Sequence, residues 1–289
     1  MRIAAAPISW GVCEVPGWGR MLDPATVLRE MADLGLAATE LGPPGYLPTA
    51  ATDLKQLLDE HRLGLVGGFL AVAMHDSATQ QSTVDQAARQ AELLAAGGAD
   101  VLVLAAATGQ DGYDERPPLR PAEWDTLVET AGMIRDRAVR TGVRTVLHPH
   151  VGTQVETSAE VKRFLADSDL PLCVDTGHLL IGGTDPVELV RRYPHRVGHV
   201  HLKDVRADLA EQVRDGRISY TQAVALGIYV PLGDGDVDLA SLLKLLRDYD
   251  YHGWYVLEQD TALPETDTGA DRLPRQATAR SLAFLDSVH

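Results

Sequence analysis

The sequence predicts an eight-fold (β/α) barrel. Its 289 residues are 45% hydrophobic, which is enough to bury a large core. Short apolar runs alternate with amphipathic helical segments along the whole chain, the pattern of parallel βα units. Eight such units follow one another, and the loop Pro16-Gly17-Trp18-Gly19 lacks the G-x-G-x-x-G spacing of a dinucleotide-binding sheet. A closed barrel is therefore favoured over an open, doubly wound sheet.

The expected strands are short runs of apolar and β-branched residues. The fourth run consists entirely of small or branched apolar residues, and the third contains two glycines. In chain order the strands are expected at residues 2–10, 38–41, 65–72, 101–106, 144–148, 172–175, 197–202 and 254–258.

Amphipathic segments with helix start signals lie between these runs. Asp23-Pro24 is one such signal, with Asp as the N-cap residue and Pro in the first turn. The helices are expected at residues 24–34, 52–61, 83–96, 122–140, 158–166, 186–192, 239–249 and 277–286.

The stretch 205–230 is the one long irregular segment, and we expect it to form an active-site loop or lid. The chain has no low-complexity region and no flexible linker. It is therefore interpreted as a single barrel domain over residues 1–289, with an insertion around 205–230.

Composition excludes several classes of partner. The 26 basic and 41 acidic residues give a formal charge of −15, which argues against a nucleic-acid partner. Cys13 and Cys173 are too few and too far apart for a disulfide framework. The amino terminus lacks the long apolar region of a signal peptide, and no apolar stretch is long enough to span a bilayer. We expect a cytoplasmic enzyme with no membrane partner.

Residues suited to binding a metal or moving protons gather at the ends of four consecutive strands. These ends read His148-Pro149-His150, Asp175-Thr176-Gly177-His178, His199-Val200-His201-Leu202-Lys203-Asp204 and Glu258-Gln259-Asp260. In a barrel they converge on one rim, so residues distant in sequence become neighbours. An Asp, a His and a Glu from successive strands form a mixed oxygen and nitrogen shell. Such a shell suits Mn²⁺, Mg²⁺, Co²⁺, Fe²⁺ or Zn²⁺.

Each of these residues also has a structural interpretation. Asp175 could cap the helix that follows it, and Glu258 could form a buried salt bridge. We expect at most one of His199 and His201 to face the barrel interior. Lys203 could pair with Asp204 or another acidic neighbour instead of binding substrate.

Six motifs make the sequence similar to a known family. They are Ile8-Ser9-Trp10-Gly11-Val12, Thr39-Glu40-Leu41-Gly42, His148-Pro149-His150-Val151-Gly152-Thr153, Asp175-Thr176-Gly177-His178, His199-Val200-His201-Leu202-Lys203-Asp204-Val205-Arg206 and Gly233-Asp234-Gly235. The chain resembles the xylose isomerase-like barrel superfamily of sugar isomerases, epimerases and dehydratases. Within it, the chain most resembles the inosose (2-keto-myo-inositol) dehydratases. The likeness covers essentially the whole chain.

The resemblance implies a metal held by carboxylates and a histidine. Asp175, His201 and Glu258 match three of the family's usual four ligands, which is also why His201 is preferred to His199. Epimerases of the family place a Glu where this chain has His148, so the fourth ligand is either His148 or Glu156. We favour Glu156 because a third carboxylate retains the preference of the site for hard, oxygen-binding cations. Glu156 could instead be a first-turn residue of the helix that follows. Mn²⁺ is the first expectation, with Co²⁺, Mg²⁺, Fe²⁺ and Zn²⁺ as alternatives.

The replacement of the epimerases' Glu by His148 favours a dehydratase-type lyase acting on a 2-keto cyclitol or related keto-sugar. The metal would make the C–H beside the keto group more acidic, and a protonated histidine would help a β-hydroxyl depart. The acid/base candidates are His148 and His150, with Glu258 as second base. His178 and Lys203 would bind substrate, and Trp10, Glu40 and Phe69 would shape the pocket, although Trp10 and Phe69 could equally be core residues.

Two other enzyme activities stay open, an epimerase or isomerase of keto-sugars and a lyase that cleaves a 3-keto-glycoside. The family also contains endonucleases acting at abasic sites, which the charge of −15 disfavours. A non-catalytic sugar-binding role would require that the polar residues at the strand ends no longer take part in any reaction. The expected partner is a small polyol or keto-sugar, and a homo-oligomer stays an open alternative.

Overall fold

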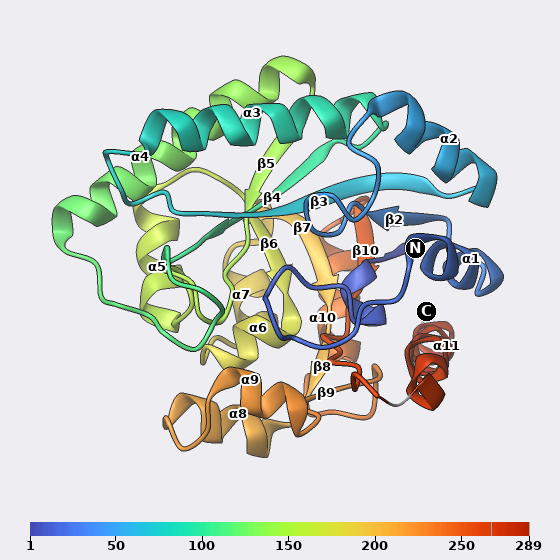
Figure 1. Ribbon diagram of the computed structural model, residues 1–289. Helices are drawn as coiled ribbons and strands as arrows, with labels where there is room; N and C mark the ends of the chain where they lie inside the picture. Colours follow the sequence, from blue (N-terminus) through green and yellow to red (C-terminus); the bar gives the residue numbers. More distant parts are fainter. Residues whose placement is uncertain (267, 289) are drawn as a thin grey trace.

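A computed structural model describes residues 1–266 and 268–288. Eight parallel strands close into a barrel in the order β1-β10-β7-β6-β5-β4-β3-β2, with helices packed around the outside (Figure 1). The expected (β/α)8 fold is therefore confirmed. The barrel strands are β1 (Arg2–Ala5), β2 (Ala38–Glu40), β3 (Gly64–Val72), β4 (Val101–Ala106), β5 (Arg144–Leu147), β6 (Leu172–Asp175), β7 (Val197–Leu202) and β10 (Trp254–Leu257).

The eight expected α-helices are present, and most of their ends lie close to the expected residues. Asp23 caps the first of them as expected, because its side chain accepts the Thr26 amide across 3.0 Å. The outer helices are α1 (Pro24–Asp33), α2 (Ala51–His61), α3 (Gln80–Ala96), α4 (Pro121–Ala138), α5 (Ser158–Asp167), α6 (Thr176–Ile181), α7 (Pro186–Arg192), α10 (Leu239–Asp248) and α11 (Leu273–Ser287). Short 3-10 helices are η1 (Pro7–Trp10), η2 (Val139–Thr141), η3 (Pro194–Arg196) and η4 (Thr268–Arg272).

Two expectations about individual elements were wrong. The first strand ends at Ala5, and Pro7 opens η1, because proline has no N–H to donate to a strand ladder. The helix α6, which starts directly after β6, was not expected. It is a short helix whose start is set by the Asp175 side chain rather than by an apolar period.

The insertion 205–230 is regular rather than irregular. It contains α8 (Ala207–Arg214) and α9 (Tyr220–Ala225), and a two-stranded antiparallel ribbon of β8 (Asp204–Val205) and β9 (Tyr229–Val230) closes it. Figure 1 shows this unit in orange at one edge of the barrel mouth. Asp204 anchors it, because its carboxylate accepts the amides of Val205, Gly233, Gly235 and Val237.

The core follows the period of two that a strand imposes. In β4, Val101 and Val103 pack with Val146 and Cys173 in a small cluster, with Phe69 against it. The alternate residues Leu102 and Leu104 join the large cluster shared with the helices. Cys13 and Cys173 are free and buried. Among the described residues, no helix is both long and apolar enough to cross a membrane.

Candidate metal centre and substrate pocket

Four side chains from four neighbouring strands meet at the floor of the barrel mouth. His148, Asp175, His201 and Glu258 each offer one ligand atom, and these atoms all lie within 4.8 Å of one another. His201 Nδ1 is 3.1 Å from Glu258 Oε2 and 3.6 Å from Asp175 Oδ2. His148 Nε2 is 3.4 Å from the same Asp175 oxygen. The strand-end clustering expected from the sequence is thus present in the structure for these four residues.

Both imidazoles present a lone pair to this group. His148 Nδ1 is 2.8 Å from the Pro149 carbonyl, which only accepts, so Nδ1 carries the proton and Nε2 is free to bind a cation. His201 Nε2 is 3.1 Å from Glu40 Oε1, so Nε2 carries the proton and Nδ1 is free. In each case the hydrogen bond made by one ring nitrogen fixes the tautomer that leaves the other nitrogen ready to bind.

The donor set fits a divalent cation. Asp175 Oδ2 and His201 Nδ1 are buried and have no hydrogen-bond partner among the described residues. Four carboxylates gather here around one ammonium, so the cluster carries a net charge of −3 when its imidazoles are neutral. These groups are Glu40, Asp175, Glu258, Asp260 and Lys203. Buried charge of this size is costly unless a cation offsets it. Mixed carboxylate and imidazole donors suit Mn²⁺, Fe²⁺, Co²⁺ or Zn²⁺.

Charges inside the cluster shift one another's pKa values. Burial opposes ionisation of Asp175, but the Lys203 ammonium holds its pKa well below the usual range. Burial alone would lower the pKa of His201, but Cys173, Glu258 and Glu40 raise it well above its ordinary value. At neutral pH only Glu258 and Glu40 act on His201 in this way. Burial raises the pKa of the Cys173 thiol to about 11, so Cys173 is uncharged there.

Lys203 is enclosed by acidic groups and remains protonated. Its Nζ lies 2.8 Å from Asp260 Oδ1, 3.0 Å from Glu258 Oε2 and 3.3 Å from Asp175 Oδ2. Burial would lower the pKa of Lys203, but the carboxylates of Asp175, Asp260 and Glu258 raise it well above its usual value. The ammonium therefore acts as a hydrogen-bond donor and a positive charge in the pocket, not as a base.

His150 lies beside the cluster with a free ring nitrogen. Its Nδ1 is 2.7 Å from the Val151 carbonyl and so carries the proton, which leaves Nε2 as the acceptor. Burial, helped by the nearby His148 and Lys203, holds the pKa of His150 well below its ordinary value. The ring is therefore neutral at pH 7, the state required of a general base.

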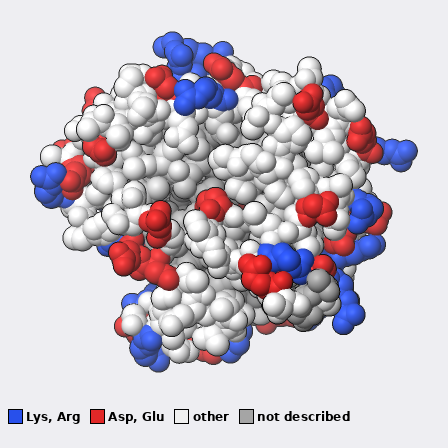
Figure 2. Space-filling model, viewed as in Figure 1, with Lys and Arg blue, Asp and Glu red and all other residues white. Residues whose placement is uncertain are grey.

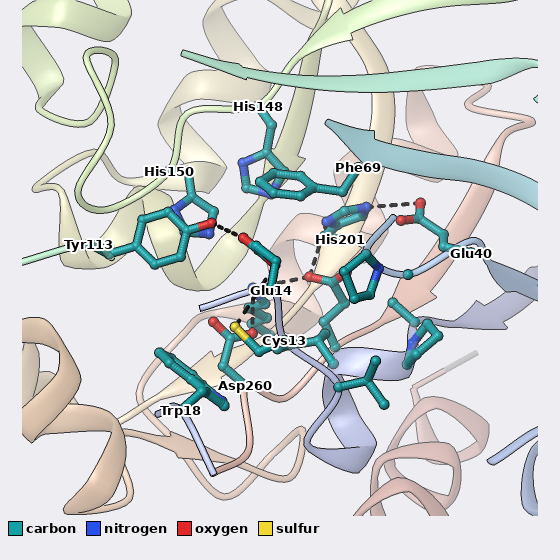
Figure 3. A pocket seen from close by; sticks show the side chains of 18 of the residues that line it. Cys13, Glu14, Trp18, Glu40, Phe69, Tyr113, His148, His150, His201 and Asp260 are labelled. Atoms are coloured by element: carbon teal, nitrogen blue, oxygen red, sulfur yellow. Dashed lines mark hydrogen bonds and ion pairs between the residues drawn. The ribbon is translucent and has the colours of Figure 1, made fainter. Parts of the chain in front are cut away.

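A pocket opens above these residues (Figure 3). Figure 2 shows a hollow near the middle of this face, with acidic side chains beside it and most Lys and Arg toward the outline. Seven of the residues singled out in the sequence line the pocket: Glu40, Phe69, His148, His150, His201, Lys203 and Glu258. Asp175 lies beneath it, fully buried.

Three predicted residues lie elsewhere. Trp10 does not line the pocket, because its indole is buried in the core and donates to Glu30 Oε2 across 2.8 Å. His178 sits behind the pocket wall, stacked on His150 with ring centroids 3.7 Å apart and 2.9 Å from Lys203 Nζ.

Glu156, favoured as the fourth ligand, lies outside the four-residue group. Its carboxylate accepts the Gly152 amide across 2.7 Å and pairs with Arg116 at 3.3 Å. His148 takes the place beside Asp175 instead. Arg116, from the segment before α4, holds the Glu156 carboxylate away from this group. The expectation that at most one of His199 and His201 faces the barrel interior differs from the structure, because residues two apart in a regular strand share a face and both rings contact Glu40.

Several pocket residues had no role assigned to them from the sequence. Cys13, Glu14 and Trp18 come from the loop before α1, which crosses the barrel mouth in Figure 3. A second set comprises Tyr113, Tyr220 and Asp260. Asp260 could have been found, since it alternates with Glu258 beyond the same strand. The loop residues carry no local signal, because only barrel closure brings them to the site.

Tyr113 and Tyr220 each connect two segments of the chain that line the pocket. The Tyr113 hydroxyl donates to Glu14, and its ring packs 4.6 Å from that of His150. Tyr220, in α9, donates to Asp260 Oδ2 across 2.7 Å and lies 3.0 Å from the Tyr229 hydroxyl. The insertion thus reaches Lys203 through Asp260.

Comparisons with known proteins agree with this architecture. A family model described as the xylose isomerase-like TIM barrel matches residues 28–288. The inosose dehydratase of Geobacillus kaustophilus is 34% identical over 282 residues, covering 93% of this chain and 91% of that protein.

Among solved structures, the IolI protein with a bound zinc atom superposes with a TM-score of 0.73 at 14% identity, covering 100% of this chain and 98% of that one. The D-allulose 3-epimerase of a Methylomonas species gives 0.71 at 19% identity, covering 100% and 98%. At these identities the two structures support the fold alone.

Proposed function

Since this chain belongs to the xylose isomerase-like TIM barrel family, we propose that it is a divalent-metal-dependent lyase that removes water from a 2-keto cyclitol such as inosose. The observation that carries this proposal is the group of His148, Asp175, His201 and Glu258 with the neutral His150 beside it. The likeness to an inosose dehydratase over more than nine-tenths of both chains supports the substrate class.

The proposed ligands are His148 Nε2, Asp175 Oδ2, His201 Nδ1 and Glu258, and Mn²⁺ is the proposed cation. When bound, the cation supplies Lewis-acid polarisation of a keto oxygen, which acidifies the neighbouring C–H bond. Zinc is named for the IolI neighbour, so Zn²⁺ is the main alternative.

His150 is the proposed acid/base residue. Its unprotonated Nε2 accepts the proton from the carbon beside the keto group. The imidazolium so formed then donates that proton to the β-hydroxyl, which leaves as water while a carbon–carbon double bond forms. One C–H and one C–O bond break, and no oxidant or reductant is consumed. His148 is assigned to the cation rather than to proton transfer.

Lys203 is the proposed fixed positive charge beside the substrate oxygens. Its ammonium is held by Asp260, Glu258 and Asp175 and stays charged, so it can stabilise negative charge that develops on the substrate. His178 supports this lysine from behind, at 2.9 Å. Phe69 and Tyr113 form apolar walls against which a ring can pack.

We further propose that residues 1–289 act as one domain whose insertion around 205–230 walls the pocket through Tyr220. A small polyol or keto-sugar is the proposed ligand. The two free cysteines support a reducing, cytoplasmic setting.

The test is to incubate the Mn²⁺-loaded protein with 2-keto-myo-inositol in D₂O. The expected result is an unsaturated product formed by loss of water, observed by mass spectrometry and ultraviolet absorbance. Deuterium incorporation with an epimer and no water-loss product would sink the dehydratase assignment. His150→Asn is expected to abolish water loss and to keep Mn²⁺ bound.

A keto-sugar epimerase is the second candidate. It requires bases on opposite faces of one carbon, and Glu258 would have to be the second base. Glu258 Oε2 lies 3.1 Å from His201 Nδ1 within the four-residue group and 3.0 Å from Lys203 Nζ, and this position favours a ligand role. Assaying D-allulose and a 3-keto-glucoside beside inosose separates the epimerase and the 3-keto-glycoside lyase from the dehydratase.

A further inference from the structure

One buried carboxylate outside the four-residue group bonds to two histidines at once. Glu40, the last residue of β2, is 2% exposed. Its Oε1 lies 2.9 Å from His199 Nε2 and 3.1 Å from His201 Nε2. Figure 3 shows Glu40 on one side of the His201 ring and His148 on the other side.

The backbone is built to place this carboxylate. The pairing of β2 with β3 shifts register between Thr39 and Glu40, so that Glu40 comes to lie opposite Gly67. A Cβ added at Gly67 would lie 2.9 Å from the Val101 carbonyl oxygen and 3.5 Å from Glu40 Oε1. The 2.9 Å approach is too close for a real side chain, so glycine at position 67 is required by the close packing of β3 against β4, beside the place that Glu40 takes.

The hydrogen-bond chemistry has one consistent solution. A carboxylate only accepts, so both Nε2 atoms that contact Glu40 must carry protons. In the neutral His201 ring the lone pair is therefore on Nδ1, which faces Asp175 and Glu258. His199 Nδ1 is buried and has no hydrogen-bond partner among the described residues, so this ring contacts only Glu40 through its polar atoms. His199 serves to hold Glu40, and Glu40 serves to hold His201.

We propose that Glu40, held by His199, is a positioning residue that orients His201 Nδ1 toward the cation and thereby sets the affinity of the site. This inference rests on the cation site proposed above. Carboxylates that accept the second ring proton of a ligating histidine fix the ring and increase its basicity, and their loss costs roughly 10–100-fold in metal affinity. The role differs from the shaping of the substrate pocket that the sequence analysis expected of Glu40.

The experiment measures Mn²⁺ and Zn²⁺ binding to the metal-stripped full-length chain by isothermal titration. Glu40→Gln is expected to weaken binding roughly 10–100-fold, with stoichiometry kept at one ion. His199→Gln, which leaves Glu40 in place but loosens it, is expected to cause a smaller loss in the same direction. If circular dichroism shows that Glu40→Gln does not fold, the Mn²⁺ and Zn²⁺ affinities of His199→Gln test the positioning role instead.

Glu30→Gln is the matched control. Glu30 also accepts a hydrogen bond from a ring N–H, that of Trp10, but it is not part of the four-residue group. The Glu30→Gln variant is therefore expected to bind the ion with wild-type affinity. If the wild type binds one ion and Glu40→Gln and His199→Gln bind it equally well, the positioning role is wrong while the cation site stands. If Glu30→Gln is weakened as much as Glu40→Gln, the effect is not specific and the inference is wrong. If the wild type binds no ion, the proposed function itself fails.

Discussion

Asp175 and His178 are joined by a hydrogen bond in which the His178 amide donates to Asp175 Oδ1 across 2.8 Å, while Oδ2 of the same carboxylate faces His148 and His201. The two interpretations left open by the sequence, a helix cap and a metal ligand, are therefore compatible. One oxygen starts α6, and the other lies 3.4 Å from His148 Nε2. The residue's position at the strand end allows both.

Asp175→Asn separates these two roles. Asparagine is as good an N-cap as aspartate, so the free energy of unfolding is expected to change by less than about 1 kcal/mol from the cap. Mn²⁺ binding, measured by titration of the stripped protein, is expected to be lost because the negative ligand is gone. Asp175→Ala should lose both the ion and about 1 kcal/mol of stability. Mn²⁺ binding by Asp175→Asn at wild-type affinity would remove Asp175 from the ligand set.

The choice between His148 and Glu156 as fourth ligand can be tested by a pair of substitutions. His148→Gln is expected to weaken Mn²⁺ binding by more than about 100-fold, beyond the loss typical of a residue that only supports a ligand. Glu156→Gln is expected to leave affinity unchanged, since its carboxylate is engaged by Gly152 and Arg116. The reverse result would restore Glu156 as the ligand. Inductively coupled plasma mass spectrometry of the purified variants gives an independent reading of metal content.

Tyr220→Phe tests the link between the insertion and Lys203. The substitution removes the hydroxyl that donates to Asp260, and a hydrogen bond to a charged group contributes about 1.5–3 kcal/mol. We expect the rate of water loss to fall about tenfold, since Asp260 then orients Lys203 less firmly, while Mn²⁺ affinity stays unchanged. Tyr249→Phe is the control, because Tyr249 is 45% exposed. If Tyr220→Phe and Tyr249→Phe remove water from the substrate at equal rates, the insertion does not influence the reaction through Tyr220.

Glu160 makes stability depend on pH. Its carboxylate accepts the Thr157 amide at 2.8 Å and binds Arg116 at 2.8 Å. Burial opposes ionisation, but these contacts lower the pKa of Glu160 below its ordinary value. Because the pKa is lower in the folded chain, ionised Glu160 stabilises the fold above the unfolded value, about 4.3. That contribution is lost as pH falls through the folded pKa.

Glu160→Gln is therefore expected to lower the free energy of unfolding by about 1–2 kcal/mol at pH 7. The difference from wild type should shrink below pH ~4, where Glu160 of the wild type becomes protonated. Urea unfolding at several pH values measures it. A difference that stays constant with pH would mean that the ionised state of Glu160 does not matter to stability.

The alternation of apolar runs and helical segments determined the barrel. The expected strands at residues 101–106, 172–175 and 197–202 coincide with β4, β6 and β7, because each is a short run dominated by apolar and β-branched residues. The period of two in a strand is a local property, so it can be read without knowing what lies on the other side of the sheet. The same reading placed Asp175, His201 and Glu258 at strand ends.

Only the tertiary structure decided which side chains meet. Arg116 captures Glu156 from a loop about forty residues earlier, and Tyr220 reaches Asp260 across a similar separation. Glu40 and His201 meet across the barrel, which selects the nitrogen that His201 offers to a cation. These contacts depend on strand register and on closure of the sheet. Neither is encoded in any short window of sequence, because loop paths and hydrogen-bond partners are set by whichever distant groups arrive at the same place.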